Sequence, residues 1–167
     1  VERKMPNAIL VGLNDRVPQL HDVYKIDLKS GKRTLVYKNE IGAIGFVADH
    51  RMKLRVAQVL RPDGGAALMH RKSDRAPWKE LTSWGGEDMF TTGPAGFAGN
   101  NRHVYMLSSV DANSVELRKL DTMTGKTETV AAEATADEAG RDSDDRPDHD
   151  REHRRRSPYR GLTCQVL

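Results

Sequence analysis

Apolar and polar residues alternate along several short stretches of the chain, and this pattern is typical of half-buried β-strands. Residues 53–60 give the clearest alternation, and residues 21–28 show a rougher version. Residues 7–14 form a short apolar stretch, which Asn14 and Asp15 are expected to end. No segment sustains the spacing of three to four residues that an amphipathic helix needs. The pattern therefore predicts a largely antiparallel β-protein.

One strand–turn–strand phrase occurs twice. Residues 24–32 recur as residues 118–126, with Asp, Gly and Lys at matching positions. The two copies lie 94 residues apart, about twice the ~40–50 residues of one propeller blade. The glycine of each turn suits the left-handed conformation of a short hairpin loop, because it has no Cβ. The repeat predicts an array of small β-sheets. The matching residues are Asp27, Gly31 and Lys32 in the first copy and Asp121, Gly125 and Lys126 in the second.

The strand-like stretches group into three units. Leu81 follows Leu35 by 46 residues, which is the length of one blade. We therefore expect an all-β fold, a partial β-propeller of about three antiparallel four-stranded blades, over residues 1–140. The expected strands cover residues 7–14, 21–28 and 33–37 in the first unit; 41–47, 53–60, 66–70 and 78–81 in the second; and 96–98, 103–109, 115–120 and 127–131 in the third.

Residues 141–167 differ in character from the rest of the chain. Between Ala139 and Tyr159 there is no Val, Ile, Leu, Met, Phe or Trp, while residues 141–156 hold six acidic residues and six arginines. Such a segment buries too little apolar area to offset its ordering entropy, so we expect a disordered tail. A reading-frame shift near Gly140 is the alternative, because the shifted reading can encode an apolar strand where the next blade is due. Val1 is expected to be a cut end of something longer.

Composition excludes several classes of partner. The length of 167 residues is that of about one domain. The net charge of +3 comes without a basic stripe interleaved with aromatic residues, so we expect no nucleic-acid partner. No apolar run approaches the ~20 residues that span a bilayer, so we expect no membrane partner. The single cysteine, Cys164, excludes an intramolecular disulfide. A soluble protein is expected, and its compartment, cytoplasmic or periplasmic, is left open.

The ordered set of these phrases resembles the N-terminal β-propeller of a prolyl oligopeptidase-family serine peptidase. It is most similar to the bacterial dipeptidyl aminopeptidase/acylaminoacyl peptidase-like group. The resemblance covers residues 5–140, and two departures are large: the tail leaves the pattern, and the α/β-hydrolase catalytic domain is missing. The residues that carry the resemblance are 9–16, 21–24, 27–32, 48–50, 54–55, 96–97, 120–121 and 124–126.

The resemblance implies a non-catalytic role. In the parent enzyme, this segment would gate the access of a peptide substrate to a separate α/β-hydrolase catalytic domain, its implied partner. The chain is then inactive alone, and no cofactor is implied. By itself, an arc of three blades leaves sheet edges open, so we expect a poorly stable or partner-dependent product. The alternative is a free-standing β-repeat module that binds a protein or peptide on its concave face.

The candidate chemical residues favour structural interpretations. Ser83 lies in a stretch that lacks the first glycine of the Gly-x-Ser-x-Gly nucleophile elbow, and no helix is expected after it. His149 and His153 stand four residues apart among acidic residues, as in a metal site on a helix. Nothing flanks them for such a helix to pack against. We therefore expect no catalytic, cofactor-binding or metal-binding residue. Residues 14–16 and 49–51 are expected to form polar turns, His21, His50 and His103 to lie at strand ends, and Trp78 and Trp84 to pack between blades.

Overall fold

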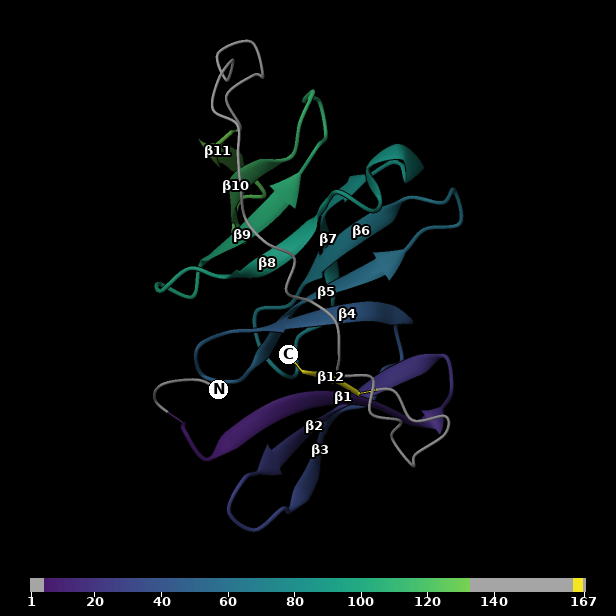
Figure 1. Ribbon diagram of the computed structural model, residues 1–167, viewed down its shortest axis with the longest axis vertical. Coiled ribbons are helices and arrows are strands. Elements are labelled where there is room, and N and C mark those ends of the chain that lie inside the picture. Colours follow the sequence, from purple (N-terminus) through teal and green to yellow (C-terminus); the bar gives the residue numbers. More distant parts are fainter. Residues whose placement is uncertain (1–4, 133–163, 167) are drawn as a thin grey trace, which may run out of the picture.

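The computed structural model describes residues 5–132 and 164–166, and these residues form three four-stranded antiparallel sheets (Figure 1). The strand order is β12-β1-β2-β3 in the first sheet, β4-β5-β6-β7 in the second and β8-β9-β10-β11 in the third. This arrangement confirms the expected all-β partial propeller of three four-stranded blades.

The first sheet consists of β1 (Ala8–Val17), β2 (Leu20–Asp27), β3 (Arg33–Tyr37) and β12 (Cys164–Val166). The second consists of β4 (Ala43–Ala48), β5 (Leu54–Leu60), β6 (Ala66–His70) and β7 (Lys79–Trp84). The third consists of β8 (Gly93–Phe97), β9 (His103–Ser108), β10 (Glu116–Asp121) and β11 (Thr127–Ala131), preceded by the 3₁₀ turn η1 (Gly86–Asp88).

The prediction for the tail falls mostly outside the described residues. Residues 133–163 and residue 167 are not described, so the expected disorder or frame shift in this segment stays a prediction. Of the tail, the structure describes β12, which pairs with β1. No helix in the described ranges is long and apolar enough to cross a membrane.

Two apolar cores hold the three sheets in series. One core lies between the first and second sheets and includes Val23 and Leu54, both fully buried. The other lies between the second and third sheets and includes Leu68 and Leu120, also fully buried. Burial of apolar area drives this stacking, because it removes each sheet face from water. Trp84 belongs to the second core and Trp78 packs against the first, so both tryptophans lie between blades as predicted.

The two copies of the repeated phrase form the same hairpin in different sheets. One joins β2 to β3 and the other joins β10 to β11. In each, the first aspartate accepts a bond from the glycine backbone N–H on its carbonyl oxygen, at 2.8 Å in both copies. Its carboxylate accepts further backbone N–H bonds, at 2.8 Å from Ser30 to Asp27 and at 2.8 Å from Met123 to Asp121. The matching connection of the second sheet, residues 71–78, lacks the phrase, which explains the spacing of two blades.

Replacing the glycine of either hairpin by alanine should destabilise the protein by about 1 kcal/mol. Gly31 and Gly125 have φ angles of +70° and +73°, where a Cβ is strained. Gly99 is the matched control, because an added Cβ there meets nothing within 4 Å and its φ is ordinary. Urea denaturation of the Gly31→Ala, Gly125→Ala and Gly99→Ala variants would measure the difference. Equal midpoints for all three would contradict the turn geometry.

Three predicted strand limits are each wrong by three residues: β7 ends at Trp84 and not at 81, β8 begins at Gly93 and not at 96, and β1 ends at Val17 and not at 14. β1 continues through Asn14 and Asp15 to Val17, and a β-bulge between Leu13 and Val17 absorbs the change of register. The Asn14 side-chain amide donates to the Pro18 carbonyl at 3.0 Å, so this polar residue is satisfied inside a strand. The second expected turn, residues 49–51, is confirmed between β4 and β5. There the Asp49 carboxylate accepts the backbone N–H of Arg51 and of Lys53, each at 2.9 Å.

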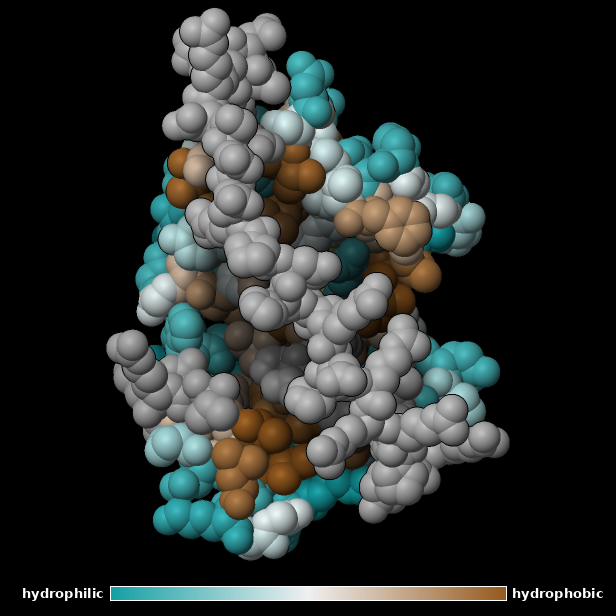
Figure 2. Space-filling view, in the orientation of Figure 1, coloured by the Kyte–Doolittle hydropathy of each residue, from teal (hydrophilic) through white to brown (hydrophobic). Residues whose placement is uncertain are grey.

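Apolar side chains remain half exposed on both outer faces of the array. Strand alternation places Leu35 on the side of the first sheet that faces away from the second. Leu107 and Val130 lie on the far side of the third sheet, and both are about half exposed. Figure 2 shows brown apolar atoms at the surface among hydrophilic ones. These faces match the expectation of an arc that does not bury all of its apolar surface.

Candidate functional site

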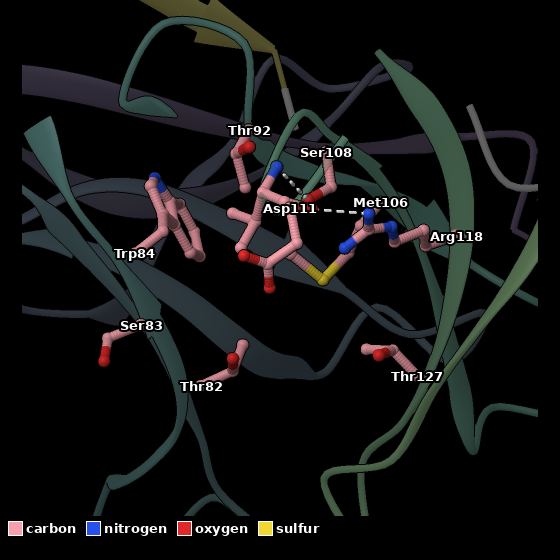
Figure 3. Close-up of a pocket in the computed structure, with 10 residues that line it drawn as sticks. Thr82, Ser83, Trp84, Thr92, Met106, Ser108, Asp111, Arg118 and Thr127 are labelled. Atoms are coloured by element: carbon pink, nitrogen blue, oxygen red, sulfur yellow. Dashed lines mark hydrogen bonds between the residues drawn. The ribbon is translucent and has the colours of Figure 1, made fainter. Parts of the chain in front are cut away.

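A cavity of about 170 Å³ lies between the second and third sheets (Figure 3). β7 brings Thr82, Ser83 and Trp84 to one side of it. The third sheet and its loops supply the opposite side, so the cavity exists only where the two sheets meet. This second set consists of Thr92, Met106, Ser108, Val110, Asp111, Arg118 and Thr127.

The charged groups around the cavity are already partly engaged. The Arg118 guanidinium donates from Nε to Glu116 at 2.9 Å and from Nη2 to the Val110 carbonyl at 2.6 Å. The hydrogen bond from Arg118 is the main cause that lowers the pKa of Glu116, and a hydrogen bond from Thr129 contributes less. The lining thus offers hydroxyl groups and an anchored guanidinium, which can hold a small polar group by hydrogen bonds.

The indole nitrogen of Trp84 adds an unused donor beside this cavity. Its Nε1 is buried and has no hydrogen-bond partner among the described residues. A buried donor without a partner is costly, since it has lost its bond to water. The cavity lining therefore holds an unused hydrogen-bond donor, but this geometry includes no nucleophile paired with a base.

Ser83 lies in a regular strand and not on a sharp turn. It stands opposite Ala67 in the antiparallel pair of β6 and β7, at the outer edge of the second sheet. A nucleophile elbow instead places its serine on a strained turn from a strand into a helix. In the part of the chain that the structure describes, no hydrogen bond joins Ser83 to a histidine. This geometry is consistent with the prediction that Ser83 is not a nucleophile. It does not test the reactivity of Ser83, so the prediction remains one.

The histidines singled out from the sequence belong to different strands or turns, and the His50 backbone N–H donates at 2.8 Å to the side chain of Asn101, two residues before His103. His21 is near the start of β2, His50 is in the turn after β4, and His103 begins β9, where its Nδ1 lies 2.7 Å from the Asn100 amide. Within residues 5–132 and 164–166, no three His, Cys, Asp or Glu side chains gather as metal ligands would. His149 and His153 lie outside the described residues.

The sequence did not indicate a cation–π group that connects the first and second sheets. It consists of Arg71, Tyr37 and Trp78, and we call it the Arg71 clasp. Arg71 stacks over the rings of Tyr37 and Trp78, with its guanidinium carbon 4.8 Å and 4.7 Å from the two centroids. The Arg71 Nε donates to the Leu54 carbonyl at 2.9 Å, and Trp78 Nε1 donates to the Tyr37 hydroxyl at 2.8 Å. Burial lowers the pKa of Arg71. The clasp unites three segments, and no local signal marks it. A lone basic residue in a polar stretch is ordinarily solvated.

A second missed group connects the first sheet to the chain that enters β4. The Asp22 carboxylate, 1 % exposed, accepts Arg16 Nε at 2.6 Å and Arg16 Nη2 at 2.8 Å. It also accepts the backbone N–H of Asn39 at 2.8 Å, and the Asn39 amide pairs with both backbone groups of Ala43. The hydrogen bond from Arg16 lowers the pKa of Asp22. This group stabilises the connection between the first and second sheets.

Two curated proteins match part of this chain in sequence. No protein-family model matches the chain. Dipeptidyl aminopeptidase BIII of Pseudoxanthomonas mexicana is 41% identical over 130 residues, which cover 78% of this chain and 19% of that protein. Dipeptidyl peptidase family member 6 of Caenorhabditis elegans is 26% identical over 107 residues, which cover 60% of this chain and 14% of that protein. The chain thus spans less than a fifth of the length of either curated relative.

A solved structure, TolB from Acinetobacter baumannii, overlaps 74% of this chain and 30% of its own chain, with a TM-score of 0.49 and 13% identity. The sequence match to the peptidase carries the assignment, and the three stacked sheets give the architecture. The chain is a partial β-propeller homologous to a segment of a dipeptidyl aminopeptidase.

Proposed function

We propose that this array gates peptide access to a separate α/β-hydrolase catalytic domain. It would form part of a wall over a serine-peptidase site and admit short or unstructured peptides by steric exclusion. The observation that carries the proposal is the 41% identity to a dipeptidyl aminopeptidase over 130 residues of stacked sheets.

The composition of the array supports a passive role. Two of its buried charged groups, Arg71 and Asp22, are engaged in connecting sheets, and Ser83 lies in a strand. A wall of this kind needs stiffness, because exclusion fails if the sheets separate. The chain then supplies shape and the catalytic domain supplies the bond chemistry.

A chimera tests the gating role. In the Pseudoxanthomonas mexicana relative, the matched segment is replaced by the corresponding residues of this chain. We expect the chimera to hydrolyse a dipeptidyl p-nitroanilide within about tenfold of the parent, and to leave the same dipeptide uncleaved at the end of a folded protein. Cleavage of the folded protein as fast as of the short substrate would contradict gating.

The full chain alone provides the companion measurement. A fluorophosphonate probe, which labels activated serines, should not label it, and Ser83→Ala is the control. Labelling that disappears in Ser83→Ala would overturn the non-catalytic assignment. Tight binding of unfolded peptides by the full chain alone would favour the free-standing binding module instead.

A further inference from the structure

The first sheet is completed by a strand from the far end of the chain. β12 pairs antiparallel with β1, with Val11 opposite Val166, Gly12 opposite Gln165 and Leu13 opposite Cys164. Figure 1 shows this short yellow strand beside β1. The other two sheets are each built from consecutive strands, so the first sheet alone recruits a distant segment.

The position of β12 can be assigned from the repeated hairpin. The hairpins β2–β3 and β10–β11 are equivalent, so β1 corresponds to β9 in the third sheet and to β5 in the second. The strand before each of these is β8 and β4. β12 therefore holds the place in the first sheet that β8 and β4 hold in theirs.

The edge of β1 that pairs with β12 has the character of a strand-accepting edge. Residues 10–13 include no charge and no proline, the devices that commonly protect a sheet edge. Other edge strands do carry such a device: Arg33 on β3, Lys79 on β7, Glu128 on β11 and Pro94 on β8. β4 has neither, but it is flanked by β2 and β8. The edge of β1 is thus suited to pair with an added strand.

We propose that this edge of β1 is a strand-acceptor site, which recognises an extended segment through main-chain hydrogen bonds. Its occupant is the Cys164–Val166 segment of the same chain. The 32 residues between Ala131 and Cys164 reach the site easily, since an extended chain spans about 3.3 Å per residue. The entropic cost of closing such a loop grows only slowly with its length.

Disulfide trapping in the full chain tests the site. Residues directly opposite in an antiparallel pair have Cα atoms about 4.5–5.5 Å apart, within the range that a disulfide bridges. Because Cys164 is the only cysteine, Leu13→Cys creates a single new pair. Under copper–phenanthroline oxidation at low protein concentration, we expect most of this variant to form a disulfide within one chain. Leu107→Cys, a half-exposed position in the third sheet, is the matched control and should stay reduced.

A peptide arm tests recognition by the edge itself. The Leu13→Cys, Cys164→Ser, Gln165→Pro chain, in which the added proline weakens the chain's own segment as a competitor, is oxidised with a synthetic peptide of residues 161–167. We expect at least fivefold more mixed disulfide with this peptide than with one carrying Gln165→Pro, which removes a backbone N–H from the middle of the strand. Equal yields for the two peptides, a disulfide only between two chains, or as much cross-linking in the Leu107→Cys control would each overturn the proposal.

Discussion

Replacement of Asp22 by alanine should destabilise the protein by about 3 kcal/mol, because it leaves buried donors without their acceptor. The Asn39 backbone N–H and two guanidinium nitrogens of Arg16 all donate to this carboxylate. We take the lower end of the usual range since the Arg16 side chain, 36% exposed, still reaches water. Urea denaturation followed by circular dichroism would measure the loss.

The pH dependence of the same group has a definite sign. The folded-state pKa of Asp22 lies below its ordinary value, so its contribution to stability is full above a pH of about 4 and is lost as the pH falls through the folded pKa. The difference in unfolding free energy between the wild type and Asp22→Asn should therefore narrow under acid. Glu80→Ala, which removes an exposed ion pair with Arg61, is the control and should cost less than 1 kcal/mol. A difference that widened under acid would exclude the charged role of Asp22.

Truncation of Leu68 to alanine should cost about 3 kcal/mol. Leu68 is fully buried in the core between the second and third sheets, so its loss removes apolar contact and leaves a cavity. Leu60→Ala is the matched control, because Leu60 belongs to the same sheet and is 49% exposed.

Hydrogen exchange would show which sheets of the Leu68→Ala protein lose amide protection. In an array, each unit is stabilised mainly by its neighbours. We therefore expect the amides of β8–β11 to lose protection more than those of β1–β3. Uniform loss over all three sheets would instead indicate that the array unfolds as one unit.

The strands and hairpins were predictable because their determinants are local. Residues 27–32 and 121–126 carry their own turn chemistry, with an aspartate that accepts backbone N–H bonds and a glycine at positive φ. The three-sheet grouping follows from the spacing of such local phrases.

Features that depend on strand irregularity or on distant partners were not predictable. Asn14 and Asp15 suggest a turn by composition, yet β1 continues through them because a bulge and the Pro18 carbonyl accommodate Asn14. The Arg71 clasp needs Tyr37 from another sheet, and the sequence around Arg71 gives no sign of this contact. The cavity likewise exists only after β7 and the third sheet come together.

The half-exposed apolar residues on the far side of the third sheet bear on how such an array could be extended. Leu107 and Val130 present apolar surface there, facing away from the second sheet, much as an inner sheet presents apolar surface to its neighbour. Duplication of a 46-residue stretch would lay another blade on that surface without redesigning the existing ones. An added copy would then extend the array at this end and leave the side chains of the existing three sheets unchanged.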